Sequence, residues 1–332
     1  MKLHDPTCGS SGIGWTNCGW IGVSFVALAL LAAGNAQAQT RDRDQQFDLR
    51  RDREAIIEAA PEAEQRQPGP RRDFEIDLTA PVLYTTNPLL ANTDTSRGVG
   101  PDWHFNPDLL LRWSHQYPSL KLSAAFDISV DRFFSQSSAD EDSTFASIKL
   151  ALGDGKSEGF VPYVSYTGIV DFQPDFHTRD DTLHDFALGF SSAIGLGSDG
   201  RVIQYRNATD PGATSFSIDL RGGRRLADPR DFENTFLVVA LDVYYVLTNE
   251  WALGLTPKLR VRWYDNFGGE FRHDYKPSTV LKAAWTPDWL TTRVRGAEID
   301  FTASFNKNYS TRESARFTEW EVGPTVALSW RF

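Results

Sequence analysis

The last eighteen residues, Ala315 to Phe332, place the tightest limit on what this chain can fold into. Side chains alternate across a β-strand, so a period of two predicts a strand with one apolar and one polar face. Carboxylates on the polar face fit a wall with lipid on one side and water on the other. The apolar face consists of Trp320, Val322, Pro324, Val326, Leu328, Trp330 and Phe332, and the polar face of Glu319, Glu321, Gly323, Thr325, Ala327, Ser329 and Arg331.

The same alternation recurs from Asp73 onward. Counted along the chain, it defines twelve segments, of which the seventh is the least regular because Gly222 and Gly223 interrupt it. About 9 to 11 tilted residues cross a bilayer, and single-chain bacterial barrels have an even number of strands. We therefore predict an all-β fold: a transmembrane, antiparallel, up-and-down β-barrel of about 12 strands. The segments are 73–84, 103–114, 119–133, 144–152, 160–172, 183–194, 215–225, 232–247, 251–264, 275–285, 293–305 and 315–332.

The links between these segments are expected to differ at the two ends of the barrel. If the C terminus is periplasmic, links after even segments are short turns and links after odd segments are outer loops. The exception is 195–214, which is long although it follows an even segment, and within it 201–206 is a candidate for a further strand or a strand extension. The expected short links are 116–119, 154–158, 249–250 and 288–292, and the expected outer loops are 87–101, 135–143, 174–181 and 268–274.

Aromatic residues gather at both predicted ends of the strands. Amphipathic rings favour the membrane interface, so two girdles indicate a lipid-spanning barrel. A soluble sandwich or lipocalin-like barrel would have no reason to segregate rings in this way. The predicted periplasmic girdle holds Trp113, Tyr117, Phe160, Trp251, Trp285, Trp289, Trp330 and Phe332, and the outer girdle holds Tyr84, Trp103, Phe133, Phe172, Trp263, Tyr275, Tyr309 and Trp320.

The first 72 residues differ from the rest. The apolar run from Ile21 to Ala33 is shorter than the roughly 20 residues that cross a bilayer as a helix, and small residues follow it. We interpret 1–38 as a signal peptide cleaved after Ala38. Residues 39–72 are charged and contain prolines, which favours a solvated periplasmic tail over a plug or a docking helix, and the barrel is expected to occupy 73–332.

Charge and cysteine content exclude several classes of function. The net charge is −10, and 1–38 contain only Lys2 and Asp5 as charged residues, so the whole charge belongs to the remaining chain. Such an acidic protein is not expected to bind nucleic acid. Cys8 and Cys18 would leave with the signal peptide. The six histidines are scattered, so we expect no metal site and no cofactor.

Opposite charges on the polar faces form two predicted ladders in the lumen. One interpretation is that they pair with each other and rigidify the wall. The other is a constriction that orients charged solutes. The basic ladder is Lys258, Arg260, Arg262, Lys276 and Lys282, and the acidic ladder is Glu75, Asp77, Glu298, Asp300, Glu319 and Glu321.

A lipid-modifying enzyme is a competing hypothesis. It would need a serine and a histidine near the lipid-facing rim. His184 is predicted to face outward there with Asp185 pointing inward, but no serine pattern accompanies it. His104 is placed in the lumen, with Asp108 four residues further on. We therefore predict no catalytic residues.

The terminal Trp330-Arg331-Phe332 resembles the C-terminal signal by which Gram-negative outer-membrane barrels are recognised, and 73–332 resemble porin-like barrels. Pro324 departs from the pattern, because it removes a ladder hydrogen bond and suggests a bulge or an irregular seam. The resemblance implies the outer membrane as location, the lipid bilayer and the barrel assembly machinery as partners, and a passive channel for small anionic or carbohydrate-like solutes. The alternative is a component of a polysaccharide or protein export system, which would dock to a periplasmic partner through 39–72 and 195–214.

Overall fold

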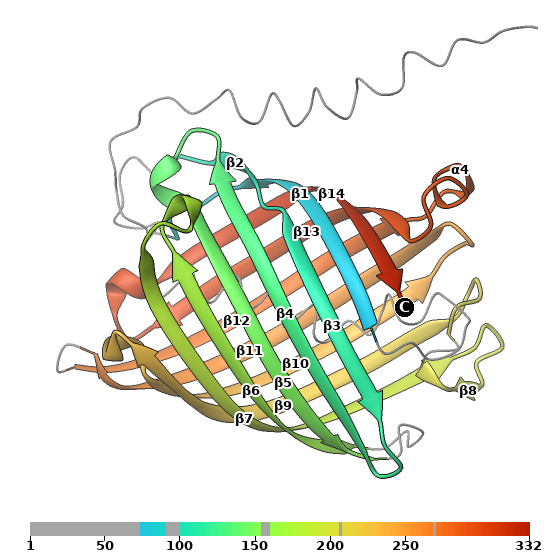
Figure 1. Ribbon diagram of the computed structural model, residues 1–332, viewed down its shortest axis with the longest axis horizontal. Coiled ribbons are helices and arrows are strands. Elements are labelled where there is room, and N and C mark those ends of the chain that lie inside the picture. Colours follow the sequence, from blue (N-terminus) through green and yellow to red (C-terminus); the bar gives the residue numbers. More distant parts are fainter. Residues whose placement is uncertain (1–73, 91–99, 154–159, 206–207, 268–269) are drawn as a thin grey trace, which may run out of the picture.

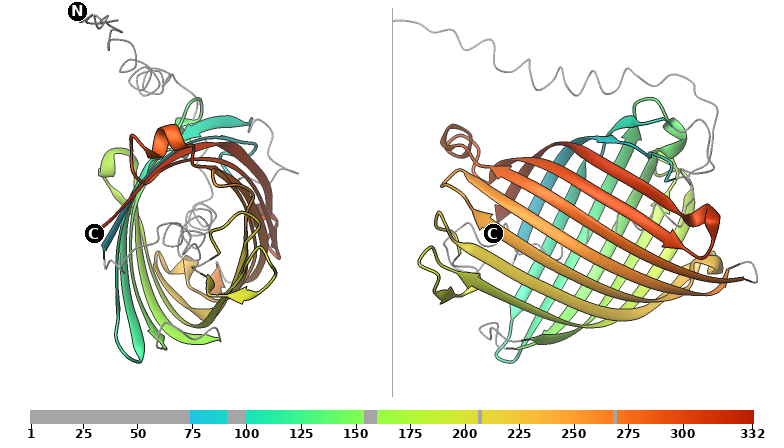
Figure 2. Two further views of the ribbon diagram at one scale, coloured as in Figure 1. Left: turned by 90° about the vertical axis from the view of Figure 1, so that its right-hand side faces the viewer. Right: turned by 180° about the vertical axis from the view of Figure 1, so that it is seen from behind.

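Antiparallel strands close on themselves to form one barrel (Figure 1, and end-on in Figure 2, left). The computed structural model describes residues 74–90, 100–153, 160–205, 208–267 and 270–332. The strands are β1 (Phe74–Thr85), β2 (Asp102–Phe105), β3 (Asp108–Gln116), β4 (Leu120–Phe133), β5 (Glu141–Leu152), β6 (Val161–Phe172), β7 (Arg179–Leu196), β8 (Val202–Ile203), β9 (Thr214–Asp228), β10 (Asn234–Val246), β11 (Trp251–Phe267), β12 (Glu270–Trp285), β13 (Ala297–Ser310) and β14 (Phe317–Arg331).

Twelve of these strand positions make up the wall, as the sequence predicts. β2 and β3 are two halves of one wall strand, because both pair with β1 in the same register, on either side of Asn106 and Pro107. β8 pairs only with Gly195 and Leu196 at the end of β7 and contributes no wall strand. Of the two alternatives predicted for 201–206, β8 fits the strand extension, because its two residues pair with the end of β7.

The wall closes where the last strand meets the first. Ile76 pairs with Trp330, and the backbone N–H of Phe332 donates to the carbonyl of Phe74 at 2.9 Å. The pairing lapses opposite Pro324, yet the register is the same on both sides of this gap, so the bulge suggested by Pro324 is not present. Gly323 permits a close approach here, because a Cβ at this position would lie 2.1 Å from the carbonyl oxygen of Val82.

The two glycines in the seventh segment do not interrupt it. β9 runs without a break through Gly222 and Gly223, in contrast to the irregularity expected from the sequence. A Cβ at Gly223 would lie 2.1 Å from the carbonyl oxygen of Phe186 on β7, so the missing side chain lets the two strands approach closely. Glycine serves strand packing here rather than a turn.

The links do not show the predicted asymmetry in length. We call the end of the barrel that holds Phe74 and Phe332 the terminal end, and the other the far end. At the far end, the predicted loop 268–274 shrinks to 268–269, because β12 begins at Glu270. Loops 135–143 and 174–181 are shortened in the same way by β5 and β7. At the terminal end the β12–β13 link spans 286–296 and contains helix α4 (Asp288–Thr291), so it is longer than expected.

Four of the described 3₁₀ turns lie in far-end links. They cap the connections between strands without covering the outside of the wall (Figures 1 and 2). They are the 3₁₀ turns η1 (Ser137–Ala139), η2 (Pro174–Phe176), η4 (Arg230–Phe232) and η5 (Glu313–Ala315). No helix among the described residues is long and apolar enough to span a bilayer.

The outside of the barrel is apolar and carries exposed aromatic rings at both ends. Trp103, Tyr309 and Trp320 are exposed at the far end, and Phe160 and Phe332 at the terminal end. A closed barrel with this exterior is what a lipid bilayer requires, since no strand edge is left unpaired. The protein is therefore an outer-membrane β-barrel.

Phe133 does not belong to the outer girdle, so the prediction that placed it there is wrong. It is buried and stacks on the ring of His104, with 4.7 Å between ring centroids. The physical reason is strand parity, because Phe133 shares the inward register of Asp127 and Asp131 on β4. The predicted signal peptide and periplasmic tail, 1–38 and 39–72, lie outside the described residues.

Candidate functional site: the charged lumen

Charged side chains fill the inward positions of the wall strands. On β11 the inward residues Lys258, Arg260 and Arg262 are almost fully buried, whereas the outward residues Leu259 and Trp263 are exposed. Burying ions is costly unless other charges or hydrogen bonds compensate. The lumen is thus the part of the molecule where a functional explanation is needed.

Cations concentrate on one sector of the lumen, which we call the basic strip. It lies on three strands, β9, β11 and β12, with the mostly uncharged inward face of β10 between the first two. All of its members are 7% exposed or less. The basic strip consists of Arg221, Arg225, Lys258, Arg260, Arg262, Arg272 and Lys276.

Two members of the basic strip stand side by side. Arg260 on β11 is directly opposite Lys276 on β12, and both side chains are 2% exposed. Residues in such cross-strand pairs have Cβ atoms about 5 Å apart, and like charges at that separation repel. Some strip members are held by acids within the wall: Arg225 makes two hydrogen bonds to Asp185, at 2.9 and 3.1 Å.

Carboxylates cover the opposite sector, which we call the acidic sector. In the strand order around the barrel, β4 lies across from β11, and β5, β6 and β7 follow it. Each carries buried acids at inward positions in the far-end half. The acidic sector consists of Asp127, Asp131, Glu141, Asp171 and Asp181. A field therefore runs across the lumen from β11 toward β4.

A second group of charges lies at the terminal end and is organised differently. Arg112 donates to Asp77 at 2.6 Å and approaches Glu75 at 3.6 Å. Arg331 donates to Glu75 twice, at 3.1 Å, across the β1–β14 seam. Lys282 reaches both Glu298 and Asp300, at 3.1 and 3.0 Å. We call these seven residues the terminal-end network, in which each cation contacts a carboxylate on a neighbouring strand.

The structure thus divides each predicted ladder between the terminal end of the barrel and the part of the lumen nearer the far end. Lys258, Arg260, Arg262 and Lys276 lie together on the basic strip, but Lys282 lies near the terminal end of β12 and belongs to the network. Glu75, Asp77, Glu298 and Asp300 also belong to the network. Glu319 and Glu321 lie toward the far end of β14, where Glu319 accepts from Thr85 at 3.0 Å.

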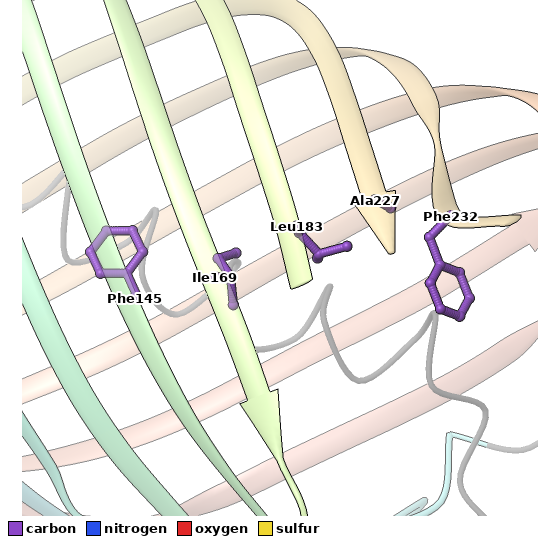
Figure 3. Close-up of a cluster of buried hydrophobic side chains, with 5 residues drawn as sticks. All are labelled: Phe145, Ile169, Leu183, Ala227 and Phe232. Atoms are coloured by element: carbon purple, nitrogen blue, oxygen red, sulfur yellow. The ribbon is translucent and has the colours of Figure 1, made fainter. Parts of the chain in front are cut away.

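The lumen wall also carries an apolar patch that sequence analysis missed. Five buried side chains from β5, β6, β7, β9 and η4 lie next to one another (Figure 3). On the strands they occupy inward positions, so the alternation of the sequence could have identified them. The patch consists of Phe145, Ile169, Leu183, Ala227 and Phe232.

Other residues missed by sequence analysis are Arg221, Arg225 and Arg272. All three occupy inward positions, because they are buried next to outward-facing neighbours. Parity along β9 and β12 would have identified them. Sequence analysis treated β9 as irregular and placed Arg272 in a loop, so the alternation was not followed along the full length of β9 or β12.

The two histidines weighed for catalysis have other partners. His104 lies in the lumen between two acids, with Nδ1 2.6 Å from Asp131 and Nε2 3.3 Å from Glu321, rather than with Asp108. The hydroxyl that contacts His184 at 2.9 Å belongs to Tyr166 and not to a serine. Within the described ranges, no group of three or more metal-ligating side chains comes together.

Comparison with known proteins finds similarity to solved structures alone. No family model matches the sequence, and no curated protein matches it. Among solved structures, KdgM porin in complex with disordered oligogalacturonate shares 13% identity, covering 76% of this chain and 97% of that one, with a TM-score of 0.38. The translocator domain of the autotransporter NalP from Neisseria meningitidis shares 9% identity, covering 87% of this chain and 98% of that one, with a TM-score of 0.40. LpxR from Salmonella typhimurium shares 9% identity, covering 76% of this chain and 99% of that one, with a TM-score of 0.36. By its own strand pairing and apolar exterior, the chain is an outer-membrane β-barrel.

Proposed function

We propose that this barrel is a narrow passive channel for small anionic or carbohydrate-like solutes. The observation that carries the proposal is the buried pairing of Arg260 with Lys276 on the basic strip. Two like charges in adjacent positions of the wall repel each other. They also raise the positive potential of this sector of the lumen, which favours an anionic solute there.

The acidic sector supports the same function. Positive charge on β11 and negative charge on β4 would orient a dipolar solute as it crosses, in the way that rings of charge select solutes in pores. The apolar patch of Figure 3 adds a surface for the nonpolar faces of sugar rings. Twelve strands make a barrel between the filled lumen of eight and the open channel of sixteen, which suits a narrow path.

The test is single-channel recording in a planar bilayer of protein purified from outer membranes. We expect stepwise conductance with anion preference, measured from the reversal potential in a salt gradient. Arg260→Gln with Lys276→Gln should lower that preference. Lys307→Gln is the matched control, because Lys307 lies on the outward face, over the ring of Tyr309, and should leave it unchanged.

Residues 39–72 form a second variable in this test. Conductance that appears only after their deletion would make them a plug of the same channel. No conductance with or without them would contradict the channel and favour the export-system hypothesis. In that case the 195–214 link, with its exposed Val202 on β8, is the surface at which a periplasmic partner would dock.

We also propose that Trp330 and Phe332 are the residues that the assembly machinery recognises. Phe332 is 63% exposed at the seam while its backbone pairs with Phe74. Deletion of Phe332 should therefore lower the amount of barrel in the outer membrane far more than the stability of barrels that do assemble. Equal losses in both would contradict a role in recognition.

A further inference from the structure

Two cations lie close together on the outside of the wall, near the far end of β13 and β14, the orange-red strands in Figure 2 (right). Lys307 pairs with Thr318 across these strands, so Arg316, two positions before Thr318, is its diagonal neighbour. Cβ atoms in such diagonal positions are about 7 Å apart. Both side chains face outward, because their neighbours Asn308 and Phe317 are buried toward the lumen. The last two strands therefore present two positive charges on the membrane side of the wall.

Contacts within the wall hold both cations beside the ring of Tyr309. The ammonium of Lys307 lies over this ring, 4.7 Å from its centroid. The Nε atom of Arg316 donates to the carbonyl of Ser310, the next residue, at 2.8 Å. Tyr309 belongs to the predicted outer girdle and is 51% exposed. The two charges therefore meet at the depth of the girdle, which is where the headgroups of lipids lie.

The surroundings of these two cations differ from those of other arginines near the far end. Within the described part of the chain, Lys307 and Arg316 contact a ring and a carbonyl rather than a carboxylate. The exposed acid nearest to Arg316 along the chain is Glu313, and the exposed Arg312 next to it carries the opposite charge. Three other arginines each contact an acid, and the pairs are Arg132–Asp142, Arg179–Asp228 and Arg224–Asp265. The site at Tyr309 therefore has a net positive charge that an anionic group can balance.

The surface around the two cations is aromatic and apolar. Tyr275 stands opposite Tyr309, and Trp320 on β14 is 55% exposed, so three rings lie at girdle depth. Toward the middle of the wall, Phe301 and Val322 are half-exposed. Flat rings suit the apolar faces of sugars, and the apolar wall beneath them suits acyl chains. In the predicted orientation the terminal end is periplasmic, so this surface meets the outer leaflet of the membrane.

We propose that Lys307 and Arg316 bind one phosphate group of an outer-leaflet glycolipid of the lipid A class. The phosphate accepts hydrogen bonds from the ammonium and the guanidinium beside Tyr309, and the sugar that carries it lies against the ring of Trp320. The acyl chains run along Phe301 and Val322. Arginine presents two parallel donors to a phosphate, and lysine adds a point charge. A lipid without the sugar or without the phosphate would make only part of these contacts.

The site is tested by native mass spectrometry of the full-length protein after reconstitution in bilayers with equal amounts of lipid A, dephosphorylated lipid A and phosphatidylglycerol. We expect lipid A to be retained in preference to the other two. Lys307→Gln and Arg316→Gln should each weaken its retention about tenfold, as loss of a charge-assisted hydrogen bond implies. Arg179→Gln is the matched control, since Arg179 makes an exposed ion pair with Asp228, away from β13 and β14.

Further measurements separate the phosphate from the rest of the lipid. Trp320→Ala should lower the preference for lipid A over phosphatidylglycerol, and added inorganic phosphate should not displace lipid A. Equal retention of the three lipids, full displacement by inorganic phosphate, or unchanged retention in the protein with both Lys307→Gln and Arg316→Gln would each overturn the proposal. The channel can fail independently, because Lys307 lies outside the wall: Lys307→Gln should alter lipid retention while the ion selectivity of the lumen stays the same.

Discussion

The terminal-end network and the basic strip contain the same cationic residue types, but the charges next to those cations differ. In the network, Arg112, Arg331 and Lys282 each contact acids on adjacent strands, so its charges stabilise the wall. In the strip, Arg260 faces Lys276. The difference shows that charge in a lumen is informative only when cross-strand register is known. Cations that contact acids on neighbouring strands stabilise the wall, whereas cations next to each other raise the positive potential that a solute in the lumen meets.

The largest expected effect comes from a paired charge within the strip. Asp185→Ala leaves the guanidinium of Arg225 buried without its two hydrogen bonds, and this should cost about 3 to 5 kcal/mol of unfolding free energy. Urea unfolding in lipid vesicles measures it. Asp228→Ala, which removes the acid of an exposed pair, is the control and should cost much less. Similar costs for the two variants would show that depth in the lumen does not matter.

Breaking the network should cost less. Asp77→Ala removes the acid that accepts from Arg112 at 2.6 Å, but Arg112 remains 25% exposed and keeps Glu75 nearby. We expect a loss of about 1 to 3 kcal/mol, because a hydrogen bond to a charged group is lost while water can still reach the guanidinium. The same urea titration measures it, with conductance selectivity as a second readout. A change in selectivity larger than that of Lys276→Gln would remove the functional distinction between the two regions.

Ion selectivity should separate the two regions more subtly. Lys276→Gln should lower the anion-to-cation permeability ratio a few-fold at low salt, whereas Lys282→Gln, whose charge is balanced by Glu298 and Asp300, should change it little. At about 1 M salt the Debye length falls to about 3 Å, so the native preference itself should fade. Reversal potentials at both salt concentrations test this, and a preference that persists in high salt would argue for size selection.

The smallest effect concerns Asp140, in the link between β4 and β5. Burial, assisted by nearby Asp131 and Asp142, raises the pKa of its carboxyl to about 6, although Arg132 and the N–H of Phe133 oppose the shift. The folded protein then holds this proton more tightly than the unfolded chain does. Stability should therefore fall slightly as the pH rises from about 4 to about 6 and stay level above that. Asp140→Asn should reduce this slope in urea titrations across the range, while an unchanged slope would assign it to other acids.

Much of the architecture was predictable because alternation is local. Each wall strand contains its own period of two, so all twelve positions were found from segments such as 251–264 without knowledge of their neighbours. The far-end limits of the strands were not found, because these strand ends carry charged residues, such as Arg272 and Asp274, whose sequence resembles that of a loop. These two residues pair with each other at 2.6 Å inside β12.

The candidate site was predictable only in part. Inward parity identified which residues face the lumen, including Arg260 and Lys276, but parity does not show which residue stands opposite which. Register depends on the pairing of separate strands and on turn lengths. The division of the ladders by depth follows from that pairing, and for this reason Lys282 was grouped with the strip. Phe133 was misplaced although parity was available, because its position at a strand end suggested a girdle.

The seam between β1 and β14 also determines the order in which the molecule can be made. Glu75 and Arg331, which pair there, are separated by 256 positions in the chain, so the first wall strand has no partner on one side until the last one has been synthesised. Until then the protein is a curved sheet with two open edges, the kind of surface that aggregates. Closure is a late event that needs β14, and a chain without this strand cannot complete the barrel.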